Sequence, residues 1–195
     1  MSKQLDFYFD IVSPASYLAW TQLPDLIKET GAEVNYYPMF LPGVFEKAGS
    51  ASPITVPSKG KWLFHDLTRW AKTYGVQFVM NERFPLSSVY AMRGLNNYRT
   101  DERFVPLANG LFQAMWANNE DINDQSVMIK ILGKAEIDAG EYTERLNDPA
   151  NKKSLIEVGE EAVKRGVFGA PTFFIGKHMH WGQDRLDFVR QDLLI

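Results

Sequence analysis

The feature of this sequence that most restricts its fold is the placement of its strand-like segments, which lie only near the two ends. Residues 5–12, 33–37, 172–175 and 178–181 are rich in aromatic and β-branched residues, and such runs predict buried strands. The middle carries apolar residues at helical spacing over residues 62–74, 87–98, 101–116, 124–134 and 141–165, with a break near Pro149. Residues 39–57 are interrupted by prolines and glycines, so we expect irregular chain there.

The first strand-like run ends at Ser13-Pro14, and this dipeptide predicts the start of a helix. Serine accepts hydrogen bonds from free amides at a helix start, and proline suits the first helical position. We expect this helix to reach Gly31, with a kink or an interruption at Pro24. A strand, a helix and a second strand in this order predict a parallel pair of strands.

The order of all the elements predicts an α/β protein: a thioredoxin-like fold with a large inserted all-helical domain. Residues 1–57 and 167–195 would form the discontinuous thioredoxin-like domain, and residues 58–166 the helical insertion. The sequence contains no repeat and no low-complexity linker. We therefore expect the insertion to pack against the thioredoxin-like domain.

The composition excludes several classes of function. Cysteine is absent, which excludes disulfides, thiolate zinc sites and a protein-borne redox thiol. The net charge is −3 and no basic run is present, so nothing favours a nucleic-acid partner. No apolar run approaches the roughly 18–20 residues of a membrane span, and the first residues lack the apolar core of a secretory signal. We expect a cytoplasmic protein. The histidines have no acidic cluster at ligand spacing, so we assign no metal.

Ser13-Pro14-Ala15-Ser16 lies at the strand-to-helix junction where thioredoxin-like proteins carry Cys-x-x-Cys. The positive end of a helix dipole stabilises an anion at this place. A serine hydroxyl cannot act as a redox thiol, but it can donate a hydrogen bond to a thiolate that a ligand supplies. The alternative, that Ser13 is only a helix cap, remains open because serine-proline helix starts are common.

Two segments near the C-terminal end also have two interpretations. Pro171 could simply mark the start of a strand; in a thioredoxin-like arrangement it is cis and faces the first helix. The backbone of Ala170 would then bind the cysteinyl part of a ligand like an added strand. Asp184 could cap the last helix, or it could receive a ligand ammonium group beside a helix start that holds a carboxylate.

Five motifs in order give the sequence a family resemblance: FYFDIVSPASYLAW, PSKGKWLFHDLTRWA, FPLSSVYAMRG, GVFGAPTFFIG and WGQDRLDFV. Together they resemble the 2-hydroxychromene-2-carboxylate isomerases, which are close relatives of kappa-class glutathione transferases within the DsbA-like group. The resemblance spans nearly the whole chain. It implies that glutathione is the cofactor and that the protein is a homodimer.

The resemblance also implies a set of glutathione-binding residues: Ser13, Ser50, Lys59, Ala170, Pro171, Gln183 and Asp184. Ser13 would contact the sulfur and is the predicted catalytic residue. Ala170 and Pro171 would bind the cysteinyl backbone, and Gln183 with Asp184 the γ-glutamyl end. Lys59 would meet the glycyl carboxylate, with Lys61 as its competitor.

The sequence departs from the family pattern at two places. Gly49-Ser50 stands where Gly-Asn is expected, and Pro85-Leu86-Ser87 stands where Pro-x-Asn is usual. A shorter hydroxyl would reach glutathione only through water, which would change affinity or substrate choice.

The implied activity is the isomerisation of a small aromatic, conjugated keto acid in naphthalene-type catabolism, by reversible addition of the glutathione thiolate. One alternative is a kappa-class-like glutathione transferase or peroxidase, which would consume glutathione. Another is a non-catalytic binder of glutathione or peptides. The sequence does not choose among the three.

Overall fold

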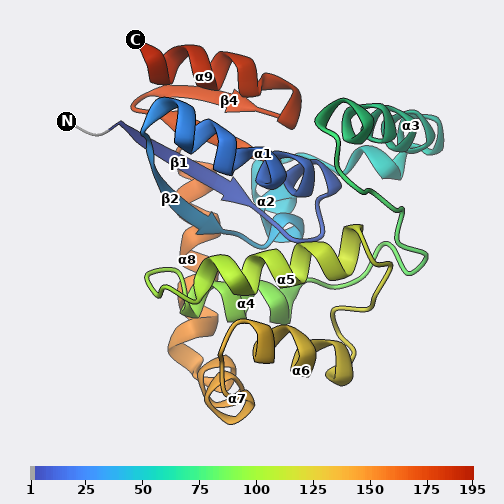
Figure 1. Ribbon diagram of the computed structural model, residues 1–195, viewed down its shortest axis with the longest axis vertical. Coiled ribbons are helices and arrows are strands. Elements are labelled where there is room, and N and C mark those ends of the chain that lie inside the picture. Colours follow the sequence, from blue (N-terminus) through green and yellow to red (C-terminus); the bar gives the residue numbers. More distant parts are fainter. Residues whose placement is uncertain (1–2) are drawn as a thin grey trace.

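The computed structural model describes residues 3–195, and these contain a mixed four-stranded sheet in the order β2-β1-β3-β4 (Figure 1). Its strands are β1 (Gln4–Phe9), β2 (Glu33–Pro38), β3 (Thr172–Ile175) and β4 (His178–Trp181). β1 pairs in parallel with β2, whereas β3 is antiparallel to both β1 and β4. The predicted parallel opening and the predicted C-terminal hairpin are confirmed.

Helices fill the chain between and beside these strands. They are α1 (Pro14–Thr30), α2 (Leu41–Ala48), α3 (Pro57–Tyr74), α4 (Val89–Asn97), α5 (Phe104–Trp116), α6 (Gln125–Lys134), α7 (Ala139–Asn147), α8 (Pro149–Lys164) and α9 (Leu186–Leu194). Two short 3₁₀ turns are η1 (Pro53–Thr55) and η2 (Gln183–Arg185). The thioredoxin-like fold with a helical middle is therefore confirmed.

One prediction of local structure is wrong. The segment predicted as irregular contains α2, because Pro42 occupies the first turn of that helix and Gly49 ends it in the left-handed conformation, at φ 62°. The proline and the glycine in this segment therefore mark the start and the end of a helix. Pro24 does not interrupt α1. It lies on the exposed side, while Leu23 and Leu26 on either side of it are buried in the core.

The two faces of the sheet are covered by different helices (Figure 1). Phe7, Phe9 and Phe173 point to the face that packs against α1 and α9, whereas Tyr8 and Phe174 point to the face covered by α2 and α8. This alternation follows from the opposite directions of neighbouring side chains in a strand. The central strands β1 and β3 are therefore buried on both faces.

The helical middle shares the core of the sheet. The rings of Phe104 and Phe112, both in α5, lie 6.4 Å and 5.8 Å from that of Phe9, and all three rings belong to one buried cluster. The division at residues 57/58 and 166/167 stays a prediction. No helix within residues 3–195 is long and apolar enough to cross a bilayer.

Candidate active site

Ser13 is the N-cap of α1, and its side chain links two parts of the chain. Its Oγ accepts a hydrogen bond from the amide of Ser16 at 3.1 Å, as expected for a cap. The same hydroxyl donates to the carbonyl oxygen of Ala170 at 3.3 Å, across 157 positions of sequence. This second bond is long, so the hydroxyl proton can be turned toward a stronger acceptor at small cost. The cap role is confirmed, and it leaves the proton of Ser13 available.

The peptide bond between Ala170 and Pro171 is cis, as expected for the thioredoxin-like arrangement. The carbonyl of Pro171 accepts a hydrogen bond from the amide of Gly182 at 2.9 Å. The start of α1, the Ala170–Pro171 loop and the segment after β4 are therefore joined in one chain of hydrogen bonds, although they come from distant parts of the sequence.

Gln183 and Asp184 lie in η2, next to this loop. Gln183 is buried, and its carbonyl accepts a hydrogen bond from the hydroxyl of Tyr74 at 2.9 Å. Burial, and then the charges of Asp187 and Asp184, raise the pKa of Tyr74 to about 12, so its phenol keeps the proton that it donates.

Asp184 does not cap the last helix, so that interpretation is wrong. The N-cap of α9 is Arg185, and no side chain caps it. The Asp184 carboxylate instead pairs with its neighbour Arg185 at 3.2 Å, with 36% of its side chain exposed. Because this carboxylate is partly exposed and pairs with its own neighbour in the chain, an ammonium group can still approach it.

Ser13, Ala170, Pro171, Gln183 and Asp184 are called the Ser13 cluster below. Within residues 3–195, no hydrogen bond links Ser50, Lys59 or Lys61 to this cluster. Ser50 follows α2, and its amide donates to the carbonyl of Phe45 at 2.9 Å. Lys59 and Lys61 are both exposed near the start of α3, and within residues 3–195 neither forms an ion pair with a protein carboxylate. The geometry does not choose between them, so their roles stay predictions.

Sequence reasoning missed Asp10, a fully buried carboxylate three positions before Ser13. Its Oδ1 accepts from the amide of Val12 at 3.0 Å. Its Oδ2 accepts from the amide of Leu41 at 2.8 Å and from the hydroxyl of Ser88 at 3.0 Å. Burial raises the pKa of Asp10 to about 6, although these three hydrogen bonds lower it. The only signal in the sequence is an aspartate that directly follows the mostly apolar end of the first strand.

We expect Asp10 to make the fold less stable at neutral pH than in mild acid. Its pKa of about 6 lies above the ordinary 3.8, so its stabilisation is complete below the ordinary value and is lost as pH rises through the folded value. A shift of about two units corresponds to about 3 kcal/mol. The free energy of unfolding by urea, measured between about pH 4 and about pH 8, should fall in the wild type relative to Asp10→Asn. A difference that is constant over this range would contradict the assignment.

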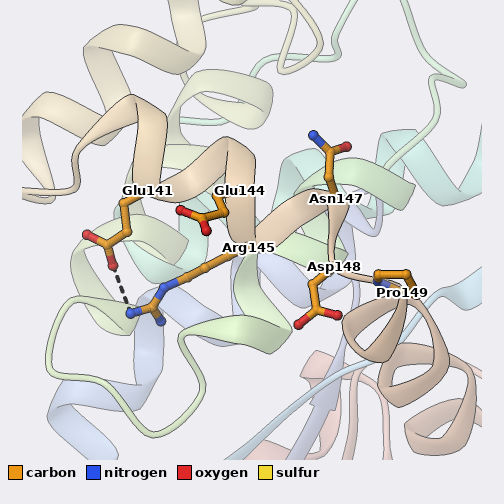
Figure 2. A pocket seen from close by; sticks show the side chains of 6 residues that line it. All are labelled: Glu141, Glu144, Arg145, Asn147, Asp148 and Pro149. Atoms are coloured by element: carbon orange, nitrogen blue, oxygen red, sulfur yellow. Dashed lines mark ion pairs between the residues drawn. The ribbon is translucent and has the colours of Figure 1, made fainter.

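One pocket in the described chain lies away from these residues. Figure 2 shows its lining at the junction of α7 and α8, formed by Glu141, Glu144, Arg145, Asn147, Asp148 and Pro149. Arg145 pairs with Glu141 at 2.8 Å, and Asp148 caps α8 through the amide of Ala150. None of the predicted glutathione-binding residues lines it. Glu141, Arg145 and Asp148 already form contacts within α7 and at the start of α8, so we assign no ligand there.

The described residues contain no group of three or more metal-ligating side chains placed to hold an ion. His178 and His180 instead share one carboxylate oxygen of Asp192, at 3.1 Å and 3.0 Å. This contact ties β4 to α9.

Comparison with known proteins places this geometry in a family. Residues 4–194 match the DsbA-like thioredoxin domain. A 2-hydroxychromene-2-carboxylate isomerase of Sphingobium xenophagum is 36% identical over 201 residues, which cover 100% of both chains. The chain belongs to the 2-hydroxychromene-2-carboxylate isomerase family. It is an enzyme of the isomerase class.

Other members and relatives agree with this assignment. An isomerase of the same name from Pseudomonas putida is 31% identical, over 93% of this chain and 90% of its own. The solved structure of a 2-hydroxychromene-2-carboxylate isomerase superposes with a TM-score of 0.88 at 29% identity, covering 96% of this chain and 93% of the other. Glutathione S-transferase kappa 1 of Caenorhabditis elegans is 25% identical over 98% of this chain and 90% of its own. The isomerase structure and the kappa transferase sequence thus each match this chain over nearly its full length.

Proposed function

We propose that this protein isomerises a small aromatic, conjugated keto acid of the 2-hydroxychromene-2-carboxylate type, with glutathione as its cofactor. The observation that carries the proposal is the contact between the Ser13 hydroxyl and the Ala170–Pro171 loop at the start of α1. In this proposal the ligand supplies the thiol, because the chain has no cysteine. The isomerase names of the full-length relatives and the kappa transferase names support the proposal.

The residues of the Ser13 cluster fit the parts of a glutathione molecule. Ser13 has a proton held only by a long hydrogen bond, and it lies at the positive end of α1. The Ala170–Pro171 loop offers a backbone edge for the cysteinyl part. Asp184, which caps no helix, suits the γ-glutamyl ammonium group. Lys59 or Lys61 would meet the glycyl carboxylate.

Each protein group has a separate task in the proposed reaction. Ser13 would donate its hydrogen bond to the sulfur and, with the dipole of α1, hold it in the thiolate form. The backbone at Ala170 would orient the cysteinyl part, and Asp184 would fix the opposite end. When bound, glutathione would supply a thiolate that adds to an unsaturated carbon of the substrate, which converts the double bond into a single bond that can rotate before the thiolate is expelled again.

A kappa-class-like transferase or peroxidase is the second candidate, because the kappa relatives match this chain over nearly its full length. Such an enzyme would use the same glutathione site but consume the thiol. A non-catalytic binder of glutathione or peptides would use the site without turnover.

The experiment that tests the proposal is an absorbance assay on 2-hydroxychromene-2-carboxylate with and without glutathione. We expect isomerisation to require glutathione and to fail with S-methylglutathione, which can fill the same site but has no thiol. Equal rates without glutathione would refute the cofactor role. No conversion under any condition would refute the substrate class.

We further propose a cytoplasmic homodimer. Reduced glutathione is available in the cytoplasm, and the family resemblance implies a dimer. Trp62, 62% exposed on α3, is the type of residue that interfaces bury. Light scattering at micromolar concentration should give a particle of two 22.3 kDa chains. A mass of one chain would contradict the dimer.

A further inference from the structure

The loop between β1 and Ser13 is held by side chains from distant helices. The amide of Ile11 donates to the sulfur of Met92 in α4 at 3.4 Å. The carbonyl of Ile11 accepts from the indole nitrogen of Trp116 in α5 at 2.8 Å. The amide of Ser13 closes the loop by donating to the carbonyl of Asp10 at 3.0 Å. The position of Ser13 therefore depends on how this short loop is anchored.

Asp10 is the central anchor of this loop, because its carboxylate contacts three separate segments. Val12 belongs to the loop itself, Leu41 is the first residue of α2, and Ser88 is the N-cap of α4. All three contacts are buried or partly buried. Within residues 3–195, no lysine, arginine or histidine forms an ion pair with Asp10, so hydrogen bonds alone hold this carboxylate.

The two backbone amides that donate to Asp10 each need their own acceptor oxygen. The amides of Val12 and Leu41 can only donate, and they point at different oxygens, Oδ1 and Oδ2. An asparagine has one oxygen and one NH₂ group. In either orientation it would place its NH₂ against a backbone N–H, which leaves a buried donor without a partner. The site therefore distinguishes aspartate from its closest neutral analogue.

We infer that Asp10 is a positioning residue for the proposed reaction, which fixes the Ser13 hydroxyl by joining the loop before α1 to the starts of α2 and α4. This inference rests on the proposed function. Asp10 itself need not touch glutathione or substrate. The predicted binding contacts at Ala170–Pro171 and Asp184 lie on other segments, so the loss of Asp10 should disturb the thiolate more than the rest of the ligand.

The test compares Asp10→Asn with the wild type in three measurements. Amide hydrogen exchange should become faster at residues 11–16. The pKa of enzyme-bound glutathione, followed by thiolate absorbance, should rise, and turnover should fall about tenfold or more. Affinity for S-methylglutathione, which has no thiol to ionise, should stay within about twofold. A loss of stability alone would weaken the binding of glutathione and of S-methylglutathione equally. It would not change the thiol pKa and turnover while leaving the affinity for S-methylglutathione unchanged.

Asn151→Ala is the matched control. Asn151 is also buried and polar, but its Nδ2 donates to the carbonyls of Arg93 at 3.1 Å and Arg145 at 3.3 Å, outside residues 10–16. It should lower stability without changing exchange at residues 11–16 or the thiol pKa. If Asp10→Asn does not fold, Ser88→Ala takes its place, and Ser88→Thr, which keeps the hydroxyl, should restore wild-type values.

Two results would overturn the inference. Wild-type exchange at residues 11–16 in a folded Asp10→Asn protein would show that Asp10 does not anchor the loop. Faster exchange with an unchanged thiol pKa and turnover would reduce Asp10 to a structural residue. Failure of the proposed function is distinguishable, because the wild type itself would then show no glutathione-dependent turnover, and exchange alone would decide whether Asp10 holds the loop.

Discussion

Ser13→Ala should lower isomerase turnover by about tenfold to a hundredfold and raise the pKa of enzyme-bound glutathione. The variant removes a donor to the thiolate, and hydrogen bonds to charged groups contribute about 1.5–3 kcal/mol. It also removes the cap of α1, which should cost about 0.5–2 kcal/mol of the free energy of unfolding. Thiolate absorbance against pH, steady-state kinetics and urea unfolding measure the three effects separately.

Ser16→Ala is the control for this prediction. The Ser16 hydroxyl is buried in the first turn of α1 and has no hydrogen-bond partner within the described chain. Its backbone amide, which serves Ser13, survives the substitution, so the thiol pKa should not change. If Ser13→Ala lowers stability but leaves the thiol pKa and turnover at wild-type values, Ser13 is only a cap.

Asp184→Ala should weaken glutathione binding by about tenfold to a hundredfold, because it removes a charged partner of the γ-glutamyl ammonium group. The fold should be little affected, since Asp184 caps no helix and, among residues 3–195, forms an ion pair only with the adjacent Arg185. Calorimetric titration with glutathione measures the change.

Asp187→Ala is the matched control for Asp184. Asp187 is the second residue of α9, is 86% exposed and pairs with Arg190. The substitution therefore removes a nearby negative charge that makes no contact with Ser13, Ala170 or Asp184. Its affinity should stay close to wild type. Equal losses in the two variants would indicate a general electrostatic effect, and no loss in Asp184→Ala would remove Asp184 from the site.

The sheet and most of the helices were predictable because their signals are local. Thr172–Ile175 and His178–Trp181 have the predicted bounds, since a strand, a Gly-Lys turn and a second strand follow each other directly. Pro42 was misread because a proline both breaks a helix and begins one, and only the packing of the following residues decides which. Val44 is buried with α8 residues, and no local pattern shows this.

The site was predictable only in part, because it combines residues that are far apart in the sequence. The placement of Pro171 against the start of the first helix was expected from the thioredoxin-like arrangement, but the hydrogen bond from Ser13 to Ala170 was not. The role of Ser88 was not expected either: sequence reasoning singled out Ser87, which is exposed, while its neighbour Ser88 is buried against Asp10. That contact depends on how α4 is placed against β1, which hydrophobic spacing alone does not specify.

The central claim is that glutathione takes part in turnover and is regenerated. A count of free thiols during turnover tests it most directly, and the cysteine-free chain adds no thiol of its own to the signal. With glutathione and excess 2-hydroxychromene-2-carboxylate, we expect many isomerisation events per glutathione and a constant thiol concentration. A loss of one thiol for each substrate molecule converted would contradict the claim and identify a transferase instead.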